Sequence, residues 1–93
     1  MTDPNRKMSE LARSFPCLRN APGIDPWDAQ VLDRWAAGSV SHGEQVTARF
    51  LLAVWDASAE WQSGRFDLME ALHVWEPSHR LPFLEWADDP WWP

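Results

Sequence analysis

Apolar residues in this sequence recur three or four positions apart, between residues that favour the start or the end of a helix. This spacing gathers them on one face of an α-helix. No segment alternates apolar and polar residues with a period of two, as a half-buried strand would. A chain of 93 residues suffices for one domain. We therefore expect an all-α fold, a small bundle of three main helices plus a short fourth.

The first main helix is expected to begin at Asp25. Aspartate is a favourable N-cap, and Pro26 then occupies the first helical position, which proline tolerates. Gly38 favours a stop just beyond the last turn. Trp27 and Trp35 fall on one apolar stripe of this helix.

The second main helix is marked by Ser41 and Glu44, the spacing of a capping box. The run 50–55 within it is apolar without a break, which is typical of a helix at the centre of a bundle or of one with an exposed apolar face. We expect the central position. The alternative is a self-associating structural protein, with a symmetric dimer contact on helix 41–56 at Leu51, Leu52 and Trp55.

The third main helix is expected to start at Asp67, with Glu70 three positions on, and to end before Pro77, because the residue before proline is pushed out of helical conformation. A short fourth helix should cover residues 79–87. If the Pro82 ring clashes with the preceding turn, this helix begins only at Pro82.

The first 23 residues differ from the rest in charge. They carry four basic and two acidic residues, whereas residues 24–93 carry four basic and twelve acidic ones. Prolines punctuate this stretch, so we expect an irregular basic N-terminal arm over 1–23, partly helical near Ser9–Phe15 and loosely docked, or used for recognition. Residues 24–93 then form one acidic, Trp-rich domain. A single helix face within the arm is formed by Met8, Leu11, Ala12 and Phe15.

The sequence motifs give little support for a catalytic or metal-binding function. The sequence holds no phosphate-binding glycine loop, no HExxH and no GxSxG, and its one cysteine, Cys17, excludes a disulfide framework. We expect no enzyme activity and no cofactor. The alternative, a metal-binding or enzymatic protein, would use His73, Glu76 and His79, which are spaced three apart.

Composition also bears on location and partners. No apolar run approaches the roughly 18 residues of a membrane span, and residues 1–15 lack the apolar core of a secretory signal. We expect a cytoplasmic protein that does not bind membranes. The net charge of -6 argues against direct binding of nucleic acid. One lysine against seven arginines is typical of a GC-rich, bacterial coding sequence.

Eight tryptophans and no tyrosine are the most distinctive part of the composition. Trp35, Trp55 and Trp75 lie on expected core faces. Tryptophan dominates many protein–protein contacts, and carboxylates around it would attract a basic partner. We therefore expect a non-enzymatic adaptor or inhibitor that presents an acidic, Trp-rich surface to a basic protein, such as a mobile-element protein that blocks a nucleic-acid-handling host machine. The expected partner-binding residues are Trp91, Trp92, Asp88, Asp89, Glu85, Trp61 and Leu52.

Overall fold

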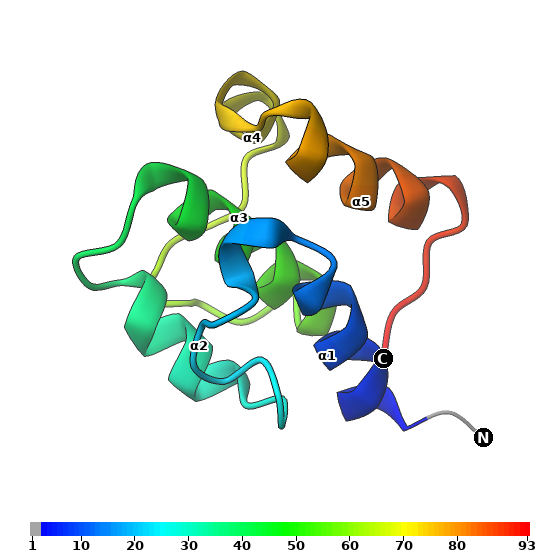
Figure 1. Cartoon of the computed structure of the whole chain (residues 1–93). Coiled ribbons are helices and arrows are strands. Elements are labelled where there is room, and N and C mark those ends of the chain that lie inside the picture. The colour runs from blue at the N-terminus through cyan, green and yellow to red at the C-terminus, as the bar shows by residue number, and fades with distance from the viewer. Residues whose placement is uncertain (1–2) are drawn as a thin grey trace.

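The structure, a computed structural model, describes residues 3–93. The expected all-α class is confirmed, because these residues form five α-helices, one 3₁₀ turn and no strand (Figure 1). The helical segments are α1 (Pro4–Arg13), η1 (Pro16–Leu18), α2 (Ala29–Ala36), α3 (His42–Trp55), α4 (Leu68–Val74) and α5 (Pro77–Asp88).

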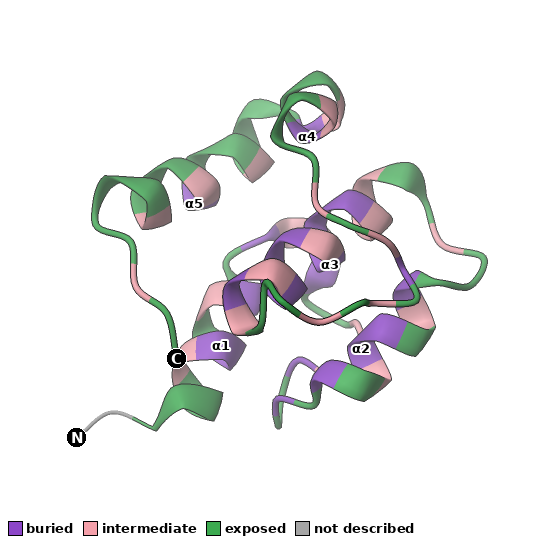
Figure 2. Cartoon of the chain, turned by 180° about the vertical axis from the view of Figure 1, so that it is seen from behind, coloured by how far each residue is buried: buried purple, intermediate pink, exposed green. Residues whose placement is uncertain are grey.

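The central helix of the fold is α3, as expected. It begins with the predicted capping box, in which the Ser41 hydroxyl accepts from Glu44 N at 3.1 Å and the Glu44 carboxylate accepts from Ser41 N at 2.9 Å. Contacts with α1, η1, α2 and α4 bury most of its surface (Figure 2). Leu51 and Leu52 are fully buried, so the alternative dimer contact at these side chains is wrong.

The N-terminal stretch is part of the core, and the expectation of an irregular arm is wrong for residues 4–18. Asp3 caps α1, and the side chains of Met8, Ala12, Phe15 and Leu18 are fully buried. Pro4 and Pro16 sit at helix starts, where proline is tolerated, so they punctuate the segment without unfolding it. Residues 1–2 of the expected arm lie outside the described residues.

The first main helix begins later than expected. The peptide bond between Asp25 and Pro26 is cis, and α2 starts at Ala29 with Asp28 as its N-cap. The Asp28 carboxylate accepts from the backbone amides of the second and third helical residues. Gly23 has a φ of +83°, and a Cβ there would lie 2.7 Å from the Asp28 carbonyl oxygen, so this turn requires glycine.

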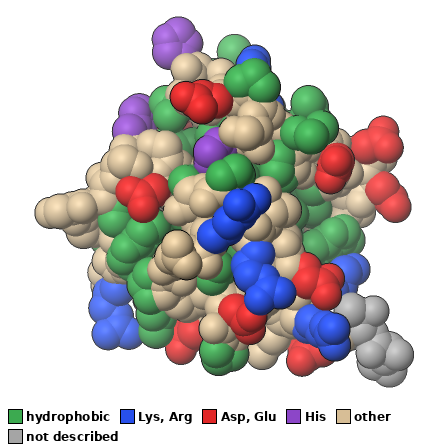
Figure 3. Space-filling model, in the orientation of Figure 1, with side chains coloured by type: hydrophobic (Ala, Val, Ile, Leu, Met, Phe, Trp, Pro, Cys, Tyr) green, Lys and Arg blue, Asp and Glu red, His purple; other side chains and the backbone are tan. Residues whose placement is uncertain are grey.

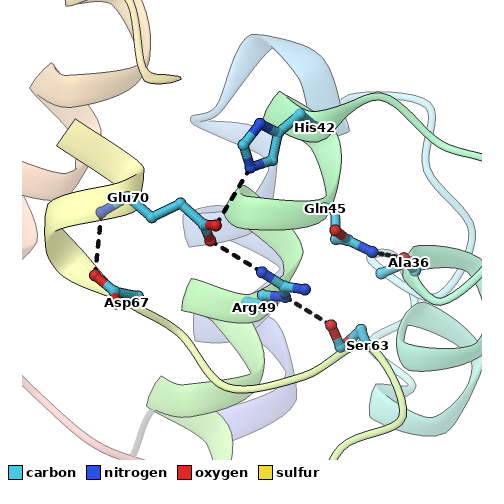
Figure 4. Close-up of polar contacts among 7 residues, drawn as sticks. All are labelled: Ala36, His42, Gln45, Arg49, Ser63, Asp67 and Glu70. Carbon is cyan, nitrogen blue, oxygen red and sulfur yellow. Dashed lines mark hydrogen bonds and ion pairs between the residues drawn. The ribbon is translucent and has the colours of Figure 1, made fainter. Parts of the chain in front are cut away.

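A polar network ties α4 to α3 (Figure 4). Asp67 caps α4 as expected, but the Glu70 side chain does not complete a capping box. Its carboxylate instead accepts from the Arg49 guanidinium at 3.0 Å and lies 3.5 Å from His42 Nε2. Arg49 also donates to the Ser63 carbonyl at 2.6 Å, which fixes the connector between α3 and α4.

The last helix is longer than the expected short fourth one. Pro77 occupies its first turn, so α5 begins five residues before Pro82, which lies inside the helix with its ring buried. Proline removes one backbone donor there without ending the helix. The described residues have a radius of gyration of 11.9 Å, close to the ~12 Å typical of a compact domain of this length.

Candidate protein-binding surface

Aromatic side chains form the contact between α5 and the rest of the fold. Phe50 of α3 lies at the centre, with its ring 5.3 Å from that of Phe83 and 5.2 Å from that of Trp86, both edge to face. Trp75 lies beside the same cluster, 5.6 Å from Phe83, and is buried as expected. Such pairs add to the stability gained from buried area, so α5 is held mainly by rings.

Within residues 3–93, the large apolar side chains that stay exposed all come from α4, α5 and the tail, residues 89–93. They are exposed by 38% to 74%, whereas α1 to α3 present none. Single exposed apolar side chains are ordinary, but their restriction to one part of a small fold is not. We call this set the α4–α5 surface: Leu68, Met69, Leu72, Leu81, Leu84 and Trp92.

An aromatic pocket opens beside this surface. It has a volume of about 190 Å³ and lies between α3, α4, α5 and the tail. Phe50 and Phe66 line it together with Phe83 and Trp86, and Leu68 and Trp92 belong both to its lining and to the α4–α5 surface. The pocket therefore offers an apolar cavity within reach of the exposed side chains. Sequence analysis missed it, although Phe83 and Trp86 share one side of a helix turn.

The tail folds back onto α5 and α1. The Trp86 indole N–H donates to the Trp91 carbonyl at 3.1 Å, and Lys7 Nζ lies 4.3 Å above the centre of the Trp91 ring. The Trp92 ring packs edge to face on Trp86 with 5.6 Å between centres, yet the residue stays 64% exposed. Trp91 thus anchors the tail, while Trp92 presents an indole to solvent.

Acidic side chains accompany the apolar ones. Glu85, Asp88 and Asp89 are exposed at the C-terminal end of α5, beside Leu84. Figure 3 shows red and green side chains together on the side of the molecule along which α5 runs. The expected partner-binding residues of this end are therefore brought together in the fold.

The two remaining expected residues lie elsewhere. Trp61 is half-buried in the connector between α3 and α4. Leu52 is fully buried, so its assignment to a binding surface is wrong. The sequence places it in line with Gln45 and Arg49, but that side of α3 is covered as well, because Gln45 donates to the Ala36 carbonyl of α2 and Arg49 donates to the connector and to α4.

His79 and Cys17 serve the fold. His79 Nε2 accepts a hydrogen bond from the Cys17 backbone N–H at 3.2 Å, linking α5 to η1. Thr47 accepts from the Trp75 indole at 2.9 Å and lies 3.5 Å from the Cys17 sulfur, and burial raises the pKa of this thiol. Across residues 3–93, no three histidine, cysteine or carboxylate side chains gather as a metal-binding group, so the alternative set of His73, Glu76 and His79 is not assembled.

None of the helices within residues 3–93 combines the length and the apolar character needed to cross a membrane. Comparison of the chain with protein-family models, with curated proteins and with solved structures gives no match.

Proposed function

We propose that this protein is a non-catalytic binding module, an adaptor or inhibitor, that docks another protein on its α4–α5 surface. The partner carries apolar side chains within a basic surface. The observation that supports this most strongly is the confinement of exposed large apolar side chains to α4, α5 and the tail. An exposed apolar patch beside polar residues is typical of a protein interaction site.

The aromatic pocket gives the docking a specific centre. Its volume of about 190 Å³ suits one large apolar side chain of a partner. Anchors that fill a desolvated pocket dominate the free energy of many interfaces, and exposed neighbours exclude water around them. Leu81 and Leu84 lie three positions apart on α5, so both can contact the same partner element.

The negative charge of this protein favours a basic partner. The net charge is -6, and Glu85, Asp88 and Asp89 are exposed beside the apolar side chains. Such a surface speeds encounter with a basic protein and disfavours an acidic one. In its most specific form, the proposal is a cytoplasmic mobile-element protein that covers the basic channel of a nucleic-acid-handling host machine.

A peptide titration tests the proposal. The probe is a fluorescent helical peptide built only of leucine and lysine, and its matched control has glutamate in place of each lysine. We expect the lysine peptide to bind and the glutamate peptide to fail, with affinity falling as salt rises. The double variant Leu81→Ser, Leu84→Ser should weaken binding by at least about tenfold, as expected for loss of two apolar side chains that contact the partner.

The control variant is Asn20→Ser, an exposed position between η1 and α2 that lines neither the aromatic pocket nor any other hollow described for this fold. It should bind like the wild type. Equal affinity of the α5 double variant and the wild type, with both folded, would contradict the proposed surface. The competing occupant of the surface is a second copy of this chain, which sedimentation of the protein alone would detect. A dimer that the same double variant dissociates would assign the surface to that second copy.

A further inference from the structure

A second hollow lies around the end of α3, on the side of α2 and the connector. Its volume is about 440 Å³. Trp55 at the end of α3 and Trp61 in the connector contribute two half-buried indoles to its lining. Two exposed carboxylates, Asp56 and Glu60, line it as well. We call it the Trp–acid hollow.

Both tryptophans are held in place by the fold. The Trp55 ring packs on that of Trp27 with 5.7 Å between centres. The Trp61 indole N–H donates to the Asp56 carbonyl at 3.1 Å, which closes the connector back onto the end of α3. Since little side-chain freedom remains to be lost, both rings are ready to contact a ligand.

The Asp56 carboxylate is also oriented. Its Oδ1 accepts from the Ser58 hydroxyl at 2.7 Å and from Ser58 N at 3.0 Å. These bonds lower the pKa of Asp56, so it is ionised at neutral pH. Both bonds reach the same oxygen, and no described residue donates to Oδ2. That oxygen remains able to accept a bond from a ligand.

Two other charged side chains, Asp33 and Arg34, also line the hollow and determine its net charge. Asp33 is buried, and its carboxylate accepts from Gln62 N and from the backbone and hydroxyl of Ser63, so it serves the fold. Arg34 is exposed and forms no ion pair among the described residues. The exposed charge of the lining is thus two carboxylates against one guanidinium, and the charge of Arg34 repels a cationic ligand.

We infer that the Trp–acid hollow binds a basic side chain, arginine or lysine, of the protein partner. A cation is attracted to the face of an indole, and the attraction is strengthened by nearby carboxylates. Arginine fits best, because its planar guanidinium can stack on a tryptophan while donating to a carboxylate. The inference rests on the proposed function, since it gives the basic partner a defined contact.

The position of the hollow supports a shared partner. A smaller hollow lies between it and the aromatic pocket. This intermediate hollow shares Ala59 and Trp61 with the Trp–acid hollow, and Ala53 and Phe66 with the aromatic pocket. The depressions therefore adjoin around the C-terminal end of α3. One partner segment can place an apolar side chain in the aromatic pocket and a basic one between Trp55 and Trp61.

A small-molecule titration tests the inference independently of the α4–α5 surface. The probe is N-acetyl-arginine amide, and the control is N-acetyl-citrulline amide, which has nearly the same shape but no charge. The indole N–H resonances of Trp55 and Trp61 should shift on addition of the arginine compound. The citrulline compound should leave them unchanged.

Charge-neutralising variants locate the site. The double variant Asp56→Asn, Glu60→Gln should weaken binding of the arginine compound by about tenfold, and Arg34→Gln should strengthen it. The control, Glu10→Gln with Asp25→Asn, makes the same change of net charge outside the lining of the hollow and should bind like the wild type.

The inference is overturned if the citrulline compound shifts the same resonances equally, or if the Asp56, Glu60 variant binds arginine as tightly as the wild type. It is also overturned if both double variants weaken binding equally, since net charge alone would then explain the effect. These outcomes leave the peptide titration unaffected. Binding of arginine with a failed peptide titration would instead separate this site from the proposed docking surface.

Discussion

At the scale of single residues, Asp28 takes the N-cap role that the sequence predicts for Asp25. Asp28 is the N-cap, with two backbone amides bound to its carboxylate. Asp25 instead forms an ion pair with Arg13 at 2.6 Å, and both side chains are about half exposed. A cap is worth about 1 kcal/mol, whereas an exposed ion pair contributes about 0–1 kcal/mol.

We therefore expect Asp28→Ala to lower the free energy of unfolding by about 1 kcal/mol, and Asp25→Ala to lower it by less. Urea denaturation of the two variants and the wild type measures the difference. A larger loss for Asp25→Ala would show that the helix begins at the earlier aspartate.

Cys17 gives a second residue-scale prediction. Desolvation raises the pKa of its thiol, so less thiolate is present at a given pH than for an exposed cysteine. Alkylation by iodoacetamide at mildly alkaline pH should be several-fold slower in the folded protein than in urea, and should accelerate as pH rises. Equal rates in the folded and unfolded protein would contradict this burial.

Single residues also mark the limit of sequence reasoning. Trp75 was predictable as core, because it shares a helix face with other apolar residues, and it is 5% exposed. Trp35 and Trp55 lie on similar stripes but are only half-buried. Periodicity identifies the face of a helix that turns inward, but the depth of burial depends on which other segments cover it.

At the scale of elements, the tail packs on α5 and α1, and the proposed function gives it a binding role as well; a deletion and a substitution separate the two. Removing residues 90–93 takes away the acceptor of the Trp86 indole N–H and the ring beneath Lys7. We expect the melting temperature to fall by several degrees, as a loss of about 1 kcal/mol produces in a domain of this size.

The substitution Trp92→Ala is the matched variant. This side chain is mostly exposed, so its loss should hardly change the melting temperature but should weaken binding of the leucine–lysine peptide. Calorimetry and the peptide titration measure the two effects. A melting temperature unchanged by the deletion would mean that the tail does not pack on α5.

Helix α3 was predictable because its signals agree: a capping box, a long apolar run and no internal proline. Residues 4–18 carry an equally clear stripe at Met8, Ala12 and Phe15, but the prolines and basic charge of this segment are also typical of a disordered end. Only the packing against α3 decides between an ordered helix and a disordered end. For α5, a helix is predicted over residues 79–87, and Pro82 argues only against the turn that precedes it. That turn forms nonetheless, and the contacts of Phe83 and Trp86 hold the helix in place.

The candidate site was less predictable than the helices. The tail tryptophans and the acids of α5 were identified from composition, since they are adjacent in the sequence. The aromatic pocket was not, because it combines Phe50, Phe66 and Phe83 from three separate segments. Long-range arrangements of this kind depend on how helices cross, which local spacing does not determine.

At the scale of the whole molecule, charge and apolar exposure are unevenly distributed. The helices α1 to α3 hold most of the fully buried side chains, whereas α4, α5 and the tail hold the exposed apolar ones (Figure 2). Residues 24–93 supply the entire acidic excess. A molecule built in this way is expected to bind through one end, with its N-terminal half serving as the scaffold.

Hydrogen–deuterium exchange with and without the leucine–lysine peptide tests this most directly, because it locates binding along the chain. We expect peptide-induced protection within residues 66–93, which include α4, α5 and the tail, and little change within residues 3–27. Protection confined to residues 3–27, or no protection anywhere at saturating peptide, would contradict the assignment of the α4–α5 surface as the docking site.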